Sequence, residues 1–590
     1  MTQPAESPAA FSDRSGAVAV VLVSLVASLL LLALQEKLLG EGAVLRSTGY
    51  TLSLGVPALL CLLLRSARDR YAWICGAVLA LLLWPLAFHT GDSCLDLPAT
   101  SPEWTRDCSD IFTPYALALG AALFVLLPFL QCFREQGRRL PYDTLYHRAW
   151  DNAQAMAAAG VFTGAGWLIL WLWAALFKLI GIRFFHELFG EERFYYPVTG
   201  LLVGLGIVLA RNQAGALRSM LRVCLALGRL LLPLIALVAL MFLAALFFTG
   251  LQPLWDTRRA TSLLLCLVLG TVALVNSVYQ EGSGGESYGA LGRRLVEAAL
   301  LTLPVYAVIA AIALQLRVAQ HGWTVERLWA AILIGFALLY AGGYALAVLW
   351  RGRAWLSRVA PVNTAVALTL IAVLLLTQSP LLDLRGISLQ SQLARAEGDP
   401  GRLDMKYLRW KLGRAGEDAL RQLQQEPRVQ ADAALTSRIE GVLKMTHPWA
   451  DEAPPPAALL AEKLAVRPQG IAAPPGLLAL LASSGERDVP SVSECIAGTR
   501  CLLLAVDLNR DGNMEWLLLR EPRSGGELPF FGERDGRWQS LGVLQRRGAL
   551  PRESDSKALT DAAERGDFRA EAPEWQDFML QGQRYGDTRW

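Results

Sequence analysis

Eleven long apolar runs between residues 17 and 377 constrain this chain more than any other feature. A helix needs roughly 17 to 25 mostly apolar residues to cross the hydrocarbon core of a bilayer. With 54% hydrophobic and 18% charged residues, the chain is also too apolar for an ordinary soluble protein. The sequence predicts an α-helical polytopic membrane bundle of about 11 transmembrane helices. The runs are 17–34, 48–64, 71–88, 111–130, 156–176, 197–210, 230–248, 261–278, 295–314, 329–349 and 364–377.

Two of these runs, 197–210 and 364–377, are short for a crossing. Flanking residues at the interface, such as Tyr195 and Tyr196 before the first and Gln378 after the second, would have to complete them.

Loop charges test the orientation of the bundle in the membrane, since Lys and Arg concentrate in cytoplasmic loops. With the N-terminus inside, the cytoplasmic segments hold 17 basic residues and the opposite segments 10. Eleven crossings then place everything after about residue 382 outside the cytoplasm.

Cysteine positions agree with this orientation. Cys94 and Cys108 bracket one loop, and Cys495 and Cys501 bracket another in the polar C-terminal region. Disulfides persist in oxidising compartments, and both pairs fall on the non-cytoplasmic side of the charge-based topology. We therefore predict a disulfide in each pair, with free surface thiols as the alternative.

The chain divides into four predicted segments. Residues 1–16 are a cytoplasmic N-terminal tail and 17–382 the transmembrane domain, whereas 383–476 form a helical stalk with a Pro-rich linker. Residues 477–590 are a small β-rich domain, so an extracytoplasmic α+β region follows the bundle. The stalk helices are predicted at 404–413 and 417–425, and the strands at 501–506, 516–519, 529–532, 538–544 and 578–585.

A loop between two predicted strands carries oxygen ligands at the spacing of a calcium loop. The ligands are Asp507, Asn509, Asp511, Asn513 and Glu515, with Gly512 at the sharp turn. The loop departs from the EF-hand because Leu518 stands where a bidentate Glu is expected and because strands flank it. Ca²⁺ is the one cofactor that the sequence suggests. A metal-free β-turn is the alternative.

Polar residues inside membrane spans are costly and therefore candidates for function. The strongest group lies around the cytoplasmic ends of the eighth and ninth runs, and the alternative role is a hydrogen-bond network that fixes this helical hairpin. Its members are Asn276, Tyr279, Gln280, Glu281 and Glu297.

No catalytic residue is predicted. The five histidines lack zinc-ligand spacing, and neither a P-loop nor a G-x-S-x-G elbow occurs. The net charge of +3 is close to neutral for 590 residues and gives no indication of a nucleic-acid partner. The predicted partners are the lipid bilayer and either a periplasmic ligand or another membrane protein.

Four stretches resemble a bacterial inner-membrane family catalogued as domain of unknown function 4153. They cover parts of residues 17 to about 425, at NSVYQEG (276–282), LRVAQHGWTVERLW (316–329), SPLLDLRGISLQSQ (379–392) and DMKYLRWKL (404–412). The resemblance implies a multi-pass protein of the bacterial inner membrane without an established activity.

The leading hypothesis is a non-enzymatic, transporter-like or sensory membrane protein whose periplasmic domain binds a ligand or partner. One alternative is an enzyme that modifies envelope lipids or polysaccharides. Such enzymes usually place acidic residues in a long first outer loop, and here that loop is short, with Glu36 and Glu41. A second alternative is a scaffold subunit of a membrane complex.

Overall fold

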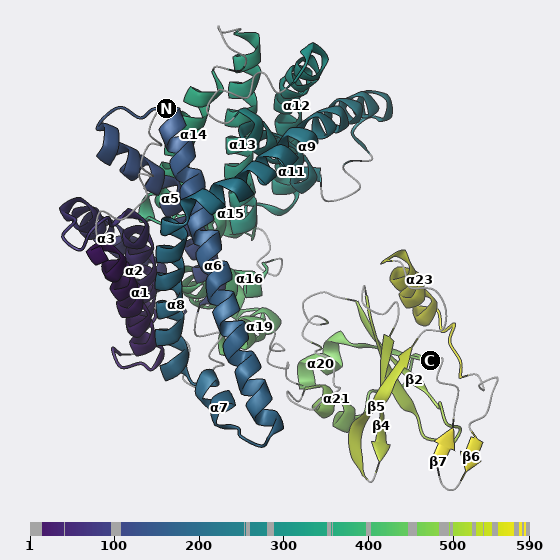
Figure 1. The fold of residues 1–590 in the computed structure, drawn as a ribbon. Helices are drawn as coiled ribbons and strands as arrows, with labels where there is room; N and C mark the ends of the chain where they lie inside the picture. Colours follow the sequence, from purple (N-terminus) through teal and green to yellow (C-terminus); the bar gives the residue numbers. More distant parts are fainter. Residues whose placement is uncertain are drawn as a thin grey trace, which may run out of the picture. The chain divides into compact units, whose positions relative to one another are not determined.

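The chain folds into two units, Met1–Asp96 with Arg106–Arg395 and Leu97–Thr105 with Ala396–Trp590 (Figure 1). The computed structural model describes residues 14–585 except 41, 96–107, 253, 255–259, 280–287, 351–355, 357, 397–402, 446–456, 483–491, 493–494, 496–499, 522–526, 535, 546–552, 571–577 and 581–582. Only the backbone is described at 214–224, 459, 527, 553–557, 578–580 and 583–585.

Six long helices of the first unit pack around one hydrophobic core and form the first half-bundle. Leu83 of the third helix and Tyr115 of the fourth are buried in this core. Small residues let the first and last of the six approach closely, since a Cβ on Gly200 would lie 2.2 Å from Ser28 Oγ. The helices are α1 (Arg14–Gln35), α2 (Ala43–Leu63), α3 (Arg70–Asp92), α5 (Ser109–Gln136), α6 (Tyr142–Leu179) and α8 (Glu192–Asn212), with the short α7 (Phe184–Gly190) between the last two.

Five further helices pack around a second core and form the second half-bundle. Val268, Leu300 and Tyr306 are among its fully buried side chains. A small third cluster, containing Ala118 of α5 and Leu374, joins the two half-bundles. The helices are α9 (Ala214–Thr249), α11 (Ala260–Tyr279), α12 (Ala290–His321), α13 (Val325–Leu349) and α14 (Val359–Leu376).

Ten helices among the described residues are long and apolar enough to cross a membrane. Every predicted apolar run lies on a long helix, and α2 is the one of these eleven helices outside the group of ten. The short sixth run becomes α8, which begins at Glu192 and therefore includes Tyr195 and Tyr196. The predicted helical bundle is thus confirmed as a class of fold.

Polar contacts show that the first three helices run in alternating directions. Ser15 of α1 accepts a hydrogen bond from the Ala67 amide beyond the end of α2, while Ser47 near the start of α2 donates to the Ala87 carbonyl near the end of α3. The helix α2 therefore runs antiparallel to both of its neighbours. Its 21 residues span about 30 Å, the thickness of a hydrocarbon core.

The helix α15 (Leu384–Ala396) follows the one-turn helix η2 (Pro380–Leu382) and packs against the connection between α12 and α13. Ser388 donates to the Trp323 carbonyl at 3.1 Å, and Arg395 donates to the carbonyls of Ala319 and Gln320. The first part of the predicted stalk segment, 383–476, is thus a helix that these bonds fasten to the bundle.

The second unit begins with a small helical module. Arg409 lies at its centre, where its guanidinium donates to the Val442 carbonyl and lies 3.4 Å from the Glu417 carboxylate. Burial lowers the pKa of Arg409, and the Glu417 charge offsets part of this effect. The module consists of α16 (Met405–Leu412), α17 (Arg414–Gln424), α18 (Pro427–Gln430) and α19 (Ala433–Lys444), so both predicted helices are present.

A five-stranded sheet forms the rest of the second unit, in the order β1-β2-β3-β4-β5. The short β1 lies in the predicted linker and pairs parallel with β2, whereas the other neighbours are antiparallel. Hydrophobic clusters cover both faces of β2, which explains its continuous apolar sequence. The elements are α20 (Ala457–Lys463), β1 (Ala465–Arg467), α21 (Pro475–Leu481), β2 (Cys501–Val506), β3 (Glu515–Arg520), β4 (Glu527–Arg534), β5 (Arg537–Gln545), α23 (Glu553–Glu564) and the separate hairpin β6 (Phe578–Leu580) and β7 (Gln583–Tyr585).

Candidate functional site

Four side chains from four helices form a hydrogen-bonded group that we call the Tyr–Asn cluster: Tyr142 of α6, Asn276 of α11, Tyr344 of α13 and Asn363 of α14. The Tyr344 hydroxyl lies 3.0 Å from Asn276 Oδ1 and 2.7 Å from Asn363 Oδ1. Asn363 Nδ2 donates to Asn276 Oδ1 at 2.7 Å and to the Tyr142 hydroxyl at 2.8 Å. The cluster therefore joins α6 of the first half-bundle to three helices of the second.

The Tyr–Asn cluster is uncharged, and two of its members are buried while Tyr142 and Asn276 are partly exposed. Tyr344 is fully buried and Asn363 is 8% exposed. The ring of Tyr142 lies 6.3 Å from that of Tyr279, and the ring of Tyr340 lies 5.9 Å from that of Tyr344. Because the four members are neutral, the cluster can orient helices and exchange hydrogen-bond partners without the cost of burying an ion.

The structure brings together part of the polar group predicted from the sequence. Asn276 is a member of the Tyr–Asn cluster and Tyr279 contacts it, whereas Glu297 lies on α12 and the cluster bonds described here do not involve it. Gln280 and Glu281 lie outside the described residues. Sequence reasoning missed Tyr142, Tyr344 and Asn363, although an amide directly before the eleventh run was a usable signal.

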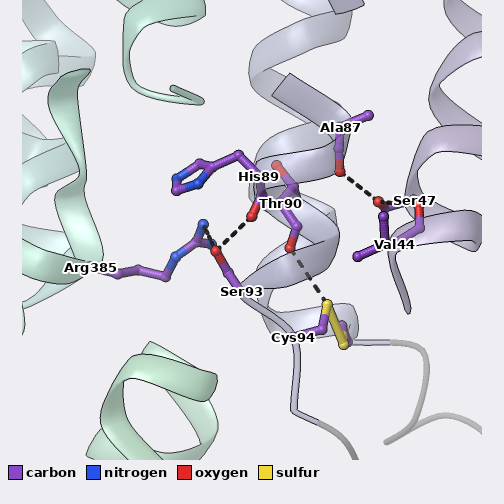
Figure 2. Close-up of a disulfide and its surroundings, with 9 residues drawn as sticks. Val44, Ser47, Ala87, His89, Thr90, Ser93, Cys94 and Arg385 are labelled. Carbon is purple, nitrogen blue, oxygen red and sulfur yellow. Dashed lines mark hydrogen bonds between the residues drawn. A yellow bond between two sulfur atoms is a disulfide. The ribbon is translucent and has the colours of Figure 1, made fainter. Parts of the chain in front are cut away.

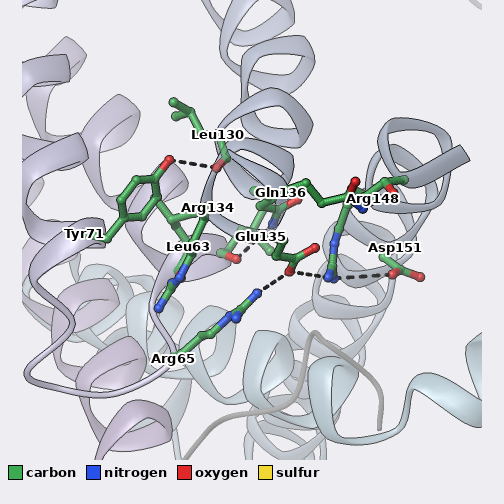
Figure 3. A network of polar contacts seen from close by, with 12 residues as sticks. Leu63, Arg65, Tyr71, Leu130, Arg134, Glu135, Gln136, Arg148 and Asp151 are labelled. Atoms are coloured by element: carbon green, nitrogen blue, oxygen red, sulfur yellow. Dashed lines mark hydrogen bonds and ion pairs between the residues drawn. The ribbon is translucent and has the colours of Figure 1, made fainter. Parts of the chain in front are cut away.

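A second group of polar side chains, the charged cluster, ties together helix ends of the first half-bundle (Figure 3). The Glu135 carboxylate pairs with Arg65 and, at 2.5 Å, with Arg148, which is only 5% exposed. Arg134 lies 2.8 Å from the Asp69 carboxylate. With Asp151, which lies 4.0 Å from Arg148, the cluster holds three acidic and three basic side chains.

The Asp69 side chain organises the start of α3 within the charged cluster. It accepts hydrogen bonds from the backbone N–H groups of Arg65 and Ala72, and the Arg134 guanidinium also contacts the face of the Tyr71 ring. Asp69 is therefore an N-cap whose charge is also paired. The sequence-based charge count included Arg65 and Arg134 among the cytoplasmic basic residues and did not pair them with an acid.

The opposite end of the bundle carries the Cys94–Cys108 disulfide, and we call it the disulfide face (Figure 2). Arg385 of α15 donates to the Ser93 hydroxyl at 3.1 Å, which links the end of α3 to the chain after α14. Burial lowers the pKa of Arg385, and the charge of Asp383 offsets part of this effect. The second predicted pair, Cys495 and Cys501, also lies at disulfide distance, so the structure brings both predicted cysteine pairs together.

The loop after β2 is held by its own hydrogen bonds. Asp507 accepts from the backbone N–H groups of Arg510 and Gly512, and Asp511 accepts from the N–H group of Asn513 at 2.7 Å. Glu515, which is 6% exposed, accepts from the Leu508 N–H group. The carboxylates of the loop thus already have backbone donors, which is the arrangement expected of a metal-free turn as well as of a calcium loop.

Within the described part of the chain, no group of three or more His, Cys, Asp or Glu side chains lies close enough together to hold a metal ion. Calcium binding by the predicted ligands, Asp507 to Glu515, therefore stays a prediction.

The enzyme alternative rested on the two acidic residues of the first outer loop. Glu36 forms an ion pair with Arg193 of α8 at 2.5 Å, and Glu41 lies outside the described residues.

Comparison with protein-family models, with curated proteins and with solved structures finds no match to this chain. The resemblance to the family of unknown function is therefore untested.

Proposed function

We propose that this chain is a multi-pass protein of the bacterial inner membrane with eleven crossings, a cytoplasmic N-terminus and a periplasmic α+β domain. The alternating helix directions support the inclusion of α2 as a crossing, and the disulfides support an oxidising compartment for both cysteine pairs. Eight long helices separate the Cys94–Cys108 loop from the second unit. An even number of crossings returns the chain to the same side, so both disulfides share a compartment whether or not α2 crosses.

Reporter fusions test this topology. Fusions after Arg139, Arg222 and Arg353 should report the cytoplasm, and fusions after Thr100 and Trp590 the periplasm. A periplasmic N-terminus would show that α2 does not cross. A cytoplasmic reporter at Trp590 would contradict the proposed location of the α+β domain.

We further propose that the protein is transporter-like or sensory, and that a ligand or partner of the periplasmic domain changes the arrangement of the two half-bundles. The observation that carries this proposal is that two hydrophobic cores are joined through α14, which packs on α5 of the first half-bundle, and through the neutral hydrogen bond from Asn363 to Tyr142. Rigid halves joined by exchangeable hydrogen bonds are suited to rocking or gating motions.

Spin-label distances in reconstituted full-length protein test the motion. Labels at exposed Leu82 of α3 and Leu339 of α13 report on the two halves, and labels at Leu82 and Leu172 of α6 are the control within the first half. A fractionated periplasmic extract should shift the distance between the halves and leave the control distance unchanged. If the distances stay fixed and liposomes show no solute flux, the proposal is wrong.

We also propose that the loop containing Asp507, Asn509, Asp511, Asn513 and Glu515 binds Ca²⁺ weakly, within the roughly 10⁻⁴ to 10⁻³ M range of extracellular modules. Its spacing of oxygen ligands supports the proposal. Calcium should then raise the melting temperature of the second unit in the full chain by mass action. Asp511→Ala should abolish the increase. Equal melting temperatures in millimolar calcium and in chelator would contradict calcium binding.

A further inference from the structure

An apolar groove of about 220 Å³ runs between α2 and α5 of the first half-bundle. Side chains of both helices form its walls, and Met156 of α6 also contributes. Representative wall residues are Leu54, Ala58 and Leu59 of α2 and Gly120, Leu123 and Phe124 of α5.

The groove has the length and the surroundings of a lipid chain. Along α2 it extends from Tyr50 to Leu62, which is about 18 Å at the helical rise of 1.5 Å per residue. One leaflet contributes about 15 Å to a hydrocarbon core of about 30 Å. The helix α5 is one of the ten long apolar helices, so its exposed side faces hydrocarbon when it crosses the membrane.

The polar atoms in the groove wall are already bonded to protein. The Thr51 hydroxyl donates to the Tyr115 hydroxyl at 3.1 Å, and the Tyr50 hydroxyl donates to Gln35 Oε1 at 3.0 Å. The remaining wall is apolar, and apolar cavities exclude water and bind apolar molecules. Hydrocarbon therefore fits this groove better than water does.

Small residues keep the groove open. A Cβ on Gly120 would meet no atom within 4 Å, so the packing of the helices does not require a glycine at this position. Ala58 on the opposite wall is likewise exposed. At Gly55, by contrast, a Cβ would lie 2.9 Å from the Leu83 side chain, so the close packing of α2 against α3 explains the glycine at this position.

We propose that the groove binds one acyl chain of a phospholipid, with the headgroup at the end near Tyr50. This end lies towards the disulfide face, because Ser47 of α2 bonds there to the end of α3. Gln35 lies beside Tyr50, and Glu36 next to it pairs with Arg193. The Arg193 side chain is 72% exposed, so its guanidinium remains accessible to a phosphate group.

Native mass spectrometry of the full chain, purified in mild detergent, tests the proposal. The wild-type protein should retain one phospholipid, identified by its mass after dissociation. Gly120→Phe fills the groove from the α5 wall and should lose the bound phospholipid. Ala58→Phe fills the groove from the α2 wall and should lose it as well. Gly164→Phe is the matched control because Gly164 of α6 also has open space around its Cβ and does not line the groove.

Retention of the phospholipid by Gly164→Phe and its loss in both groove variants is the expected result. If Gly120→Phe does not elute as the folded protein, Ala58→Phe and the smaller change Gly120→Leu decide the question. The proposal is overturned if the wild type retains no lipid, if both groove variants retain it, or if the bound molecule is not a phospholipid.

Discussion

The charged cluster and the Tyr–Asn cluster both tie helices together, but they do so with different chemistry. The charged cluster lies within the first half-bundle and uses ion pairs such as Glu135 with Arg148. The Tyr–Asn cluster is built from neutral groups, three of them on helices of the second half-bundle, and it reaches the first half-bundle through the hydrogen bond from Asn363 to Tyr142 of α6. Separating a buried ion pair leaves an unpaired charge and is expensive, whereas neutral groups exchange partners at modest cost. The ion pairs therefore favour a rigid first half-bundle, whereas the neutral hydrogen bonds allow the two half-bundles to move relative to each other.

The largest effect is expected from Glu135→Ala. The substitution leaves Arg148, with a 6% exposed side chain, without its closest carboxylate, and removal of one partner from a buried ion pair costs about 3–5 kcal/mol. Because the Glu135 side chain is 19% exposed and Asp151 remains 4.0 Å from Arg148, we expect the lower end of this range. Steric-trapping measurements of unfolding in bicelles should show the loss, and Glu135→Gln should recover part of it. A loss below about 1 kcal/mol would show that the ion pair of Glu135 and Arg148 stabilises the protein no more than an exposed surface ion pair does.

A smaller loss is expected from Asn363→Leu, which removes bonds to three residues at once. Interhelical hydrogen bonds in membranes average about 0.6 kcal/mol, so the loss should be about 2 kcal/mol. The same variant should broaden the Leu82–Leu339 distance distribution and leave the Leu82–Leu172 distance unchanged. Broadening of both distances would indicate general unfolding and not a loosened joint.

Tyr344→Phe sharpens the comparison further because it removes one hydroxyl and keeps the ring. We expect a loss of about 0.6 kcal/mol, the average for one such bond, in the same steric-trapping measurement. Tyr340→Phe is the control, since the Tyr340 ring contacts Tyr344 but its hydroxyl is not part of the cluster. Equal losses in the two variants would show that the Tyr344 hydrogen bonds contribute nothing measurable.

The smallest effect concerns a carboxylate outside the membrane. The Asn513 N–H group and the Asn509 amide hold the pKa of Asp511 below its ordinary value of 3.8. The stabilisation of the folded loop is therefore complete above this value and is lost as the pH falls below it. Hydrogen exchange at residues 507–515, corrected for intrinsic rates, should increase on acidification, and Asp511→Asn should remove this dependence. A corrected exchange rate that does not change with pH in the wild type would contradict the proposed contribution of the Asp511 carboxylate.

Local patterns accounted for much of the fold. The apolar runs predicted long helices because an apolar segment in lipid can satisfy its backbone N–H and C=O groups within itself only as a helix. The strand at 501–506 was predicted with its final limits, since a short apolar run bounded by turns identifies a buried strand. The strand β1 was missed because three residues carry too little pattern, and its partner β2 lies far along the chain.

The partners in the polar clusters were not predictable in the same way. Asn276 was identified because an amide in an apolar run is conspicuous, but its partners lie on α13 and α14. Glu135 was not identified because its arginines, Arg65 and Arg148, belong to other helix ends. A single sequence contains no information on which of several similar groups will meet across helices.

The sequence by itself determined that most of the chain forms long apolar helices, that a polar region follows them and which cysteines pair, since length, hydropathy and short spacing are local properties. Only the tertiary structure decided that the helices pack around two cores, that a hydrogen bond between the neutral side chains of Asn363 and Tyr142 joins the halves, and that a groove between α2 and α5 stays open. These features depend on which helix faces meet. In a uniformly apolar chain, close packing and a few hydrogen bonds make that choice, and hydropathy does not.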